Sequence, residues 1–331
     1  MTVKPSTRVM APNAEAIAEA VRCLAAGGLV AFPTETVYGL GADATNGTAI
    51  ARLYDAKGRP AFNPLIAHVV DAAAARRLGV FDPAAARLAE ALWPGPLTLV
   101  LPRRPDCPVV ELATAGLDTI ALRVPGHAVA RDLLAAFGRP IAAPSANRSG
   151  HVSPTTASHV LADLRGRIDL VLDGEAAPVG VESTIVACLG EPMLLRPGGV
   201  PRADVERVLG RALVEPPLAD PSGDAETPLA PGQLAAHYAP RTLLRLDAHS
   251  VNAGEALLAF GAPLPAGSER AVRMLNLSAA GDLIEAAANL FSHLRALDSS
   301  GAAAIAVMPI PQAGLGEAIN DRLNRAAGPR P

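Results

Sequence analysis

The residues whose types and spacing could do chemistry lie in five polar clusters, each where an apolar stretch of sequence gives way to a loop. The clusters are PTETVYGLG at 33–41, KGRPAFNP at 57–64, AAPSANRSGHVSP at 142–154, EST at 182–184 and RPGG at 196–199. Loops at the ends of strands are where α/β sheets bind their ligands. The clusters therefore predict a ligand site formed by distant parts of the chain.

The second cluster contains the basic pair Lys57 and Arg59 at the expected end of a helix. Two cations there would complement the helix dipole, which is a common structural role. Alternatively, the prolines and glycine around them fix the loop and direct both side chains at one anion. Lys57 is the only lysine besides Lys4 in this arginine-rich chain, and a compact ammonium is a good point-charge ligand for phosphate. Both interpretations fit the residues.

The first and third clusters contain more hydroxyl and amide groups than local structure requires. A glycine-rich turn explains the glycines of 33–41 but not its run of polar and aromatic residues. In 142–154, several hydroxyls and amides precede a helix expected to begin near Thr155, yet only one residue can be the N-cap. The surplus indicates phosphate binding at this helix N-terminus.

Two expected strands contain single polar residues of ambiguous role. His68, within LIAHVV, is more typical of a hydrogen-bonded core histidine than of a ligand. Thr119 and Arg123, within DTIALRVP, emerge on the same face of a strand four residues apart. A buried arginine requires an anionic partner, which could be a bound carboxylate or phosphate or an acid of the protein itself.

Familiar signatures of other chemistries are missing from the sequence. There is no GxxxxGK[ST] loop, no third glycine after Gly39 and Gly41, no GxSxG and no histidine pair with zinc spacing. We therefore expect no protein-held metal, and any ATP site must be unconventional. The three cysteines are too far apart for a CxxC motif or a dense disulfide framework, which favours a reducing cytoplasm.

The charge balance argues against a broadly basic surface. The chain of 331 residues has 29 basic and 32 acidic residues, and residues 1–210 contain 20 of each. Nonspecific nucleic-acid binding needs a large basic excess, so any anion site must be local. The N-terminus has no apolar stretch typical of a signal peptide, and no uncharged run predicts a membrane span.

The elements that must position the clusters alternate between short apolar runs and amphipathic segments, which predicts an α/β layer fold. Expected strands are Leu29–Phe32, Leu65–Val70, Leu97–Leu101, Thr119–Val124, Ile141–Ala143, Leu170–Leu172, Thr184–Leu189 and Met193–Arg196. Expected helices are one after Asn13 and those at Thr48–Ala56, Pro83–Leu92, Ala128–Phe137, Thr155–Leu164 and Ala203–Leu213. Asn13 and Asp82 are the predicted N-caps of the first helix and of the helix at Pro83.

Length and composition predict two domains joined by a linker. Residues 1–213 form the first, residues 214–240 are rich in proline, glycine and acids, and residues 241–331 form a small Rossmann-like α/β unit. In the second domain we expect strands at Leu243–Leu246, Ala271–Leu275 and Ala303–Met308. We expect helices there at Ala253–Phe260, Asp282–Leu297 and Glu317–Ala326.

Together the clusters resemble those of the YrdC-like and Sua-type threonylcarbamoyl-AMP synthases. PTETVYGLGADA, KGRPAFNPL, DTIALRVPG, APSANRSGHVSPT, GVESTIV and LLRPGG occur in that family's order over about residues 14–210, and HYAP at 237–240 with the region after it is similar to the longer, two-domain form. Gln233 departs from the methionine usual after Pro-Gly. The resemblance implies an open twisted α/β sheet around a positively lined cavity.

The resemblance also implies an activity and the residues that perform it. Threonine and bicarbonate would give a carbamate that attacks ATP with Mg²⁺, and a separate transferase would use the product to modify tRNA; contact with tRNA itself is possible but not required. The implied catalytic set is Lys57, Arg59, Ser145 and Asn147. The implied threonine ligands are Thr34, His68, Thr119, Arg123 and Ser183. The ATP set adds Asn63, Ala143, Ser153 and Arg196 to Lys57, Arg59 and Ser145, and our interpretation of the linker, given below, adds Tyr238.

Two other functions fit parts of the sequence. A basic concavity without turnover would make the chain an RNA-binding module, although the neutral balance of residues 1–210 argues against it. Another acyl- or carbamoyl-adenylating enzyme would share the cavity but use a different substrate. A further expectation concerns residues 214–240, which we interpret as a lid with Tyr238 against the nucleotide. The simpler alternative is that Tyr238 only anchors the second domain.

Overall fold

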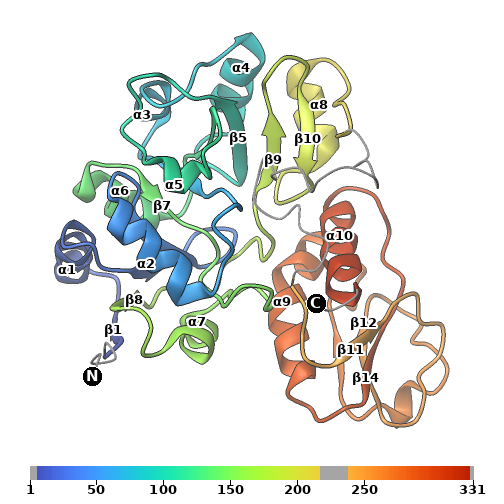
Figure 1. Cartoon of the computed structure of the whole chain (residues 1–331). Helices are drawn as coiled ribbons and strands as arrows, with labels where there is room; N and C mark the ends of the chain where they lie inside the picture. Colours follow the sequence, from blue (N-terminus) through green and yellow to red (C-terminus); the bar gives the residue numbers. More distant parts are fainter. Residues whose placement is uncertain (1–5, 217–237, 329–331) are drawn as a thin grey trace.

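The structure is a computed structural model that describes residues 6–216 and 238–328. Residues 217–237, which include Gln233, His237 and most of the expected linker, lie outside the described part of the chain. Two sheets with flanking helices form two bodies that lie side by side (Figure 1). The larger holds the N-terminal two thirds of the chain, and the smaller follows residue 238.

The larger sheet is mixed, and its described strands run in the order β1-β8-β2-β3-β7-β4-β6-β5-β9-β10. The strands are β1 (Arg8–Met10), β2 (Val30–Phe32), β3 (Gly39–Asp43), β4 (Ile66–His68), β5 (Leu97–Pro102), β6 (Thr119–Arg123), β7 (Ile141–Ala142), β8 (Leu170–Leu172), β9 (Thr184–Ala187) and β10 (Met193–Arg196). This order places the C-terminal ends of β2, β4, β6 and β7 near the N-terminal end of β9, although these strands are far apart in sequence. The open twisted α/β sheet expected from the sequence is confirmed.

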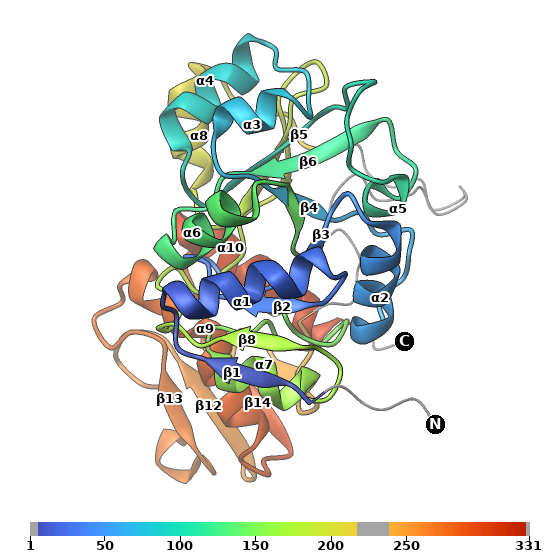
Figure 2. The same ribbon diagram turned by 90° about the vertical axis from the view of Figure 1, so that its left-hand side faces the viewer.

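Helices cover both faces of this sheet. They are α1 (Ala14–Ala25), α2 (Gly47–Lys57), α3 (Ala72–Arg76), α4 (Pro83–Leu92), α5 (Glu111–Thr114), α6 (Ala128–Phe137), α7 (Ala157–Leu164) and α8 (Arg202–Leu209). Apolar residues of α1 and α6 pack together over β2 and β8, and α1 lies in front of β2 in Figure 2. Residues of α2, α4, α7 and α8 belong to a second apolar cluster. The sheet is therefore buried on both faces.

Two helix starts follow the predicted capping chemistry. The Asn13 side chain accepts a hydrogen bond from the backbone N–H of Ala16, and that of Asp82 accepts one from Ala85 at 2.7 Å. Each side chain satisfies a backbone donor that has no partner within its helix. Both predicted N-caps are confirmed.

One strand that positions the site was not expected. The glycine-rich part of the first cluster is β3, which pairs antiparallel with both β2 and β7. A Cβ on Gly41 would lie 2.8 Å from Phe32 and 2.9 Å from Ile141, so only glycine allows these side chains to pack across the strand. The glycines that indicated a loop are a packing requirement.

The smaller sheet has the order β11-β14-β12-β13, and all its described pairings are parallel. It consists of β11 (Leu243–Arg245), β12 (Glu255–Ala259), β13 (Met274–Asn276) and β14 (Ala304–Val307), with helices α9 (Leu283–Asp298) and α10 (Leu315–Ala327). The helix expected at Ala253–Phe260 is wrong, because these residues form strand β12. This inner strand is buried on both faces and has an apolar run at residues 256–259, so its sequence lacks the alternation that separates strand from helix.

Among residues 6–216 and 238–328, none of the helices combines the length and the hydrophobicity needed to span a membrane.

Candidate active site

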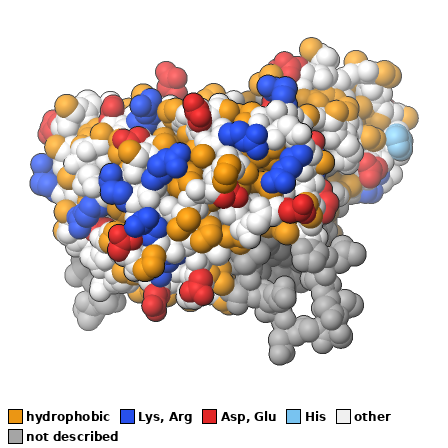
Figure 3. All heavy atoms as spheres, turned by 90° about the horizontal axis from the view of Figure 1, so that it is seen from above, with side chains coloured by type: hydrophobic (Ala, Val, Ile, Leu, Met, Phe, Trp, Pro, Cys, Tyr) orange, Lys and Arg blue, Asp and Glu red, His pale blue; other side chains and the backbone are white. Residues whose placement is uncertain are grey.

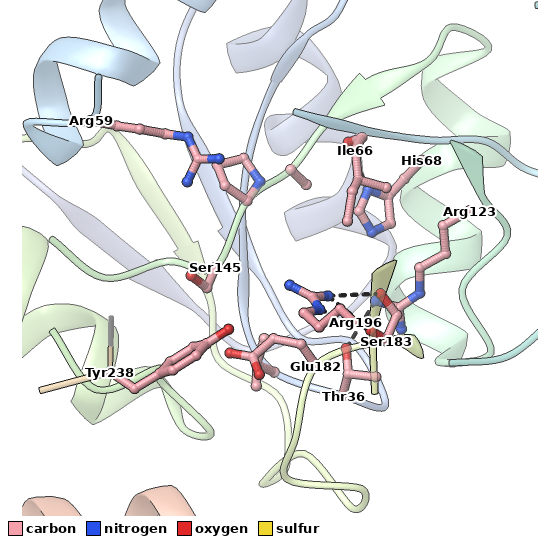
Figure 4. A pocket seen from close by; sticks show the side chains of 13 residues that line it. Thr36, Arg59, Ile66, His68, Arg123, Ser145, Glu182, Ser183, Arg196 and Tyr238 are labelled. Atoms are coloured by element: carbon pink, nitrogen blue, oxygen red, sulfur yellow. Dashed lines mark hydrogen bonds between the residues drawn. The ribbon is translucent and has the colours of Figure 1, made fainter. Parts of the chain in front are cut away.

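Residues from all five polar clusters meet at one cavity. Figure 4 shows basic, hydroxyl and aromatic side chains converging on it from separate strands and loops. Its lining consists of Thr36, Val37, Arg59, Ile66, His68, Arg123, Ala143, Pro144, Ser145, Glu182, Ser183, Arg196 and Tyr238. Three arginines in a buried space predict an anionic ligand.

Lys57 does not line the cavity but supports a loop that does. It is the last residue of α2, and its Nζ donates to the backbone carbonyls of Ser145 and Asn147, each at 2.5 Å. Asn147 is buried, and its side-chain amide donates to the His151 carbonyl at 2.7 Å. Burial, followed by the Arg59 charge, lowers the pKa of Lys57 well below its usual range. Lys57 therefore holds the loop that presents Ser145.

Arg59 reaches the cavity from the loop after α2. Its Nη2 donates to the Pro64 carbonyl at 3.0 Å, and its Nε donates to the Asn63 carbonyl at 3.3 Å. Burial lowers the pKa of Arg59 to about 10, so the guanidinium remains charged at neutral pH. The buried Asn63 Oδ1 has no hydrogen-bond partner in the structure. Asn63 itself is not among the residues that line the cavity.

Arg123, at the end of β6, has a protein acid as a partner. Its Nη2 lies 2.7 Å from Oε1 of Glu35, and its Nη1 donates to the Thr36 hydroxyl at 2.9 Å. Burial favours the neutral acid, but the Arg123 charge more than offsets it, so the pKa of Glu35 lies below its usual value. Thr34 donates to the Val37 carbonyl at 2.6 Å and so stabilises the turn, while Thr36 lines the cavity.

His68 and Thr119 differ in position. His68 is buried, lines the cavity, and has Nδ1 3.3 Å from the Ile66 carbonyl oxygen. Thr119 pairs with Pro102 at the opposite end of β6 from Arg123. Four residues of extended strand span about 13 Å, so the shared face predicted for the two does not bring them to one small ligand. The structure does not place Thr119 at the cavity.

Ser183 and Arg196 form the opposite wall. The Arg196 guanidinium donates to the Ser183 carbonyl and, from Nη2, to the Ser183 hydroxyl at 3.2 Å. The Ser183 hydroxyl is also within 2.8 Å of the Thr98 hydroxyl. A Cβ on Gly198 would lie 2.4 Å from backbone atoms of 182–184, so glycine there allows the RPGG loop to lie directly against this wall.

Glu182 lines the cavity beside Ser183 and was not among the expected site residues. The Ser153 hydroxyl, fully buried, donates to its Oε1 at 2.5 Å. Ala143 completes this side of the lining. Thr36 and Glu182 belong to clusters that the sequence singles out, but the sequence does not indicate which side of each turn faces the cavity.

Tyr238 lines the cavity and is 1% exposed. Its ring stacks on Phe291 of α9 with centroids 5.7 Å apart, and in Figure 4 its hydroxyl end points toward Glu182. The backbone φ is +64°, a left-handed conformation that is unusual for a non-glycine residue. Tyr238 therefore contacts both the second domain and the site.

Comparisons with known proteins agree with this arrangement. Residues 22–198 match the sequence family Sua5_yciO_yrdC, described as telomere recombination, and residues 200–328 match the family described as threonylcarbamoyl-AMP synthase, C-terminal domain. The chain is 40% identical to the threonylcarbamoyl-AMP synthase of Bacillus subtilis over 98% of this chain and 96% of the relative. It is 42% identical to that of Pyrococcus abyssi over 92% of each.

A solved structure extends the similarity to three dimensions. The crystal structure of Pyrococcus abyssi Sua5 complexed with L-threonine superposes with a TM-score of 0.85 at 37% identity, covering 97% of this chain and 96% of that one. The similarity therefore includes both bodies of the fold and all five clusters. The chain belongs to the threonylcarbamoyl-AMP synthase family.

Proposed function

We propose that this chain is a nucleotidyltransferase that makes L-threonylcarbamoyl-AMP and pyrophosphate from L-threonine, bicarbonate and ATP. The observation on which the proposal depends is the buried cavity with Arg59, Arg123 and Arg196, in a family whose relatives are named for this product. The threonine amine condenses with bicarbonate to a carbamate and water. A carbamate oxygen then bonds to the α-phosphorus while the bond to the pyrophosphate oxygen breaks.

The catalytic requirement is stabilisation of the negative charge on the leaving pyrophosphate. We assign this to Arg59 and Ser145 at the cavity, with Lys57 and Asn147 holding the Ser145 loop in place. Fixed donors in a site without bulk water act more strongly than the same groups in water. The nucleotide would also contact Asn63, Ala143, Ser153, Arg196 and Tyr238.

Threonine would bind on the His68, Arg123 and Ser183 side. Arg123 is suited to the substrate carboxylate, although Glu35 already shares its charge. His68 and Ser183 can bond the hydroxyl and amine of the substrate. Thr36 takes the position at the cavity that we expected for Thr34, whose hydroxyl is engaged in the turn.

We propose that magnesium enters the site only bound to ATP. Glu182, which lines the cavity, is paired with Arg322, and Glu35 is paired with the cavity residue Arg123. Within the described residues, no group of three or more His, Cys, Asp or Glu side chains is arranged to hold a metal ion. We therefore propose that the phosphates of ATP are the ligands of the ion. We assign no residue role through it.

The product would pass to a separate transferase that modifies the adenosine next to the tRNA anticodon. We propose a cytoplasmic location, supported by the cysteines Cys23, Cys107 and Cys188, all unpaired in the structure. An RNA-binding module without turnover is less well supported. On the face shown in Figure 3, basic side chains are interspersed with acidic and apolar ones.

The test is mass spectrometry after incubation with threonine, bicarbonate, magnesium and ATP. We expect threonylcarbamoyl-AMP and one pyrophosphate per adenylate. ADP and phosphate as the products of ATP would contradict this mechanism. Competition by serine or carbamoyl phosphate would instead indicate a related adenylating enzyme with another substrate, and RNA binding that weakens steeply with salt, without turnover, would favour the binding module.

A further inference from the structure

Arg322 is a charged residue of the second domain that is completely buried. It lies on α10, and its side chain extends to the first domain. Nε donates to Oε2 of Glu182 at 2.9 Å, and Nη1 donates to the Pro197 carbonyl at 2.8 Å. The neighbouring Asp321 accepts a third hydrogen bond, at 2.7 Å. Such a residue is costly to bury and needs these partners to be tolerated.

Glu182 connects Arg322 to the cavity. One of its oxygens accepts from Arg322 and the other from the Ser153 hydroxyl at 2.5 Å, and Glu182 itself lines the cavity. The three residues form a continuous buried chain from α10 to the loop before α7. A carboxylate in this place would repel a polyphosphate if it had no cation beside it. Arg322 supplies such a cation, in hydrogen-bond contact, from outside the first domain, and the charge of Arg196 in the first domain also acts on Glu182.

The second domain also supports the aromatic side of the cavity. The Arg322 guanidinium lies 5.3 Å from the centre of the Tyr238 ring, which also stacks on Phe291. Val37, Val152 and Val181 of the first domain belong to the same apolar cluster as the core of the second. The cavity loops thus pack directly into the second domain.

We propose that Arg322 is a positioning residue for ATP binding, which acts by neutralising and orienting Glu182 on the wall of the cavity. The second domain then completes the nucleotide side of a site that otherwise belongs to the first domain. This inference rests on the proposed function, because it takes ATP as the ligand of the cavity. Arg322 does not line the cavity, so its effect is transmitted through Glu182, Ser153 and Tyr238.

The test compares Arg322→Met with Arg202→Met. Arg202 of α8 forms an ion pair at 2.6 Å with Glu317 of the second domain. Arg202 is partly exposed and does not line the cavity. We expect Arg322→Met to raise the Kd for ATP, measured by calorimetry on the full chain, by about tenfold or more, because Glu182 loses its ion pair and keeps only the Arg196 charge near it. We expect Arg202→Met to leave the Kd within about twofold of wild type because rim ion pairs contribute little.

The second arm is a rescue. In Arg322→Met with Glu182→Gln, the uncompensated charge is gone, so ATP affinity should return to within about threefold of wild type. Arg322→Lys retains the charge and should give an intermediate Kd with a melting temperature near wild type, which keeps the test valid if Arg322→Met fails to fold. Equal ATP affinities in the Arg322 and Arg202 variants, or no recovery in the double variant, would overturn the inference. A wild-type chain that makes no adenylate would instead contradict the proposed function.

Discussion

His68 and Arg123 are direct neighbours in the parallel ladder between β4 and β6. Both are buried, and both line the cavity. Burial, with the Arg123 charge as the next contribution, lowers the pKa of His68 to about 3 from an ordinary value of 6.5. The imidazole is therefore neutral at physiological pH and can both donate and accept a hydrogen bond to a ligand.

His68→Gln should make the protein less sensitive to acid. Between pH 6.5 and 3 the unfolded state binds a proton at His68 that the folded state does not, so lowering the pH favours unfolding. The free energy of unfolding of wild type should fall relative to the variant by up to about 1.4 kcal/mol per pH unit in this window. Urea unfolding at pH 7.5, 5.5 and 4.5 measures the difference, and a constant difference over this range would contradict the neutral buried state.

Arg59→Ala and Lys57→Met should separate a ligand role from a supporting one. We expect Arg59→Ala to lower kcat/KM by roughly 10²-fold, since it removes a fixed charge at the cavity. Lys57→Met should also lower the free energy of unfolding, by about 1–3 kcal/mol, because two buried carbonyls lose their donor. Arg52→Met is the control, because Arg52 lies on the same helix but pairs with Asp169 outside the cavity.

Melting temperatures and rates measured on the same samples decide between the two interpretations of this basic pair. If the cations served only the helix dipole, both substitutions would cost about 0.3–1 kcal/mol of stability and leave turnover intact.

Gly198→Ala adds a single methyl group but should markedly weaken substrate binding. The new Cβ would lie 2.4 Å from the backbone of 182–184, so Glu182 and Ser183 must shift. We expect the KM for threonine to rise by about tenfold, as happens when positioning groups are displaced. Gly47→Ala is the matched control, since nothing lies within 4 Å of its added Cβ and it sits at the start of α2. That substitution should be neutral or stabilising by up to about 1 kcal/mol. Equal effects of the two would contradict the close approach.

Elements with local signals could be predicted from the sequence, and those that depend on distant packing could not. Asn13 and Asp82 act through backbone groups three residues away, so their capping roles are visible in the chain itself. Strand β12 is buried on both faces by neighbouring strands and helices, and its apolar run at residues 256–259 also suits a helix. Arg322 is 140 residues from Glu182, and no local pattern marks such a pair.

The candidate site shows the same limit on a smaller scale. The sequence places Thr34 and Thr36 in one cluster, but which hydroxyl stabilises the turn and which faces the cavity depends on the path of residues 33–38 in space. Thr119 and Arg123 share a face as expected, yet the length of the strand separates them. The meeting of the five clusters at one place could be predicted from the sequence, whereas the position of each side chain required the fold.

Tyr238 has contacts that suit both roles considered for it, anchoring the second domain and touching the nucleotide. The Tyr238 ring stacks on Phe291 and lies beside the Arg322 guanidinium. A nucleotide in the cavity would instead contact the hydroxyl end of the side chain. Two substitutions can therefore separate the roles, because one removes only the hydroxyl and the other removes the ring as well.

Tyr238→Ala should lower the free energy of unfolding by about 3–5 kcal/mol, as expected for loss of a buried aromatic ring. Tyr238→Phe keeps the stacking, so its stability should stay near that of wild type. If the hydroxyl bonds the nucleotide, Tyr238→Phe should still raise the KM for ATP about fivefold, the effect of losing one hydrogen bond of about 1 kcal/mol. Phe291→Leu is the control, because it weakens the stacking without touching the hydroxyl. An unchanged KM for ATP in Tyr238→Phe, together with a destabilised Phe291→Leu, would mean that Tyr238 only anchors the second domain.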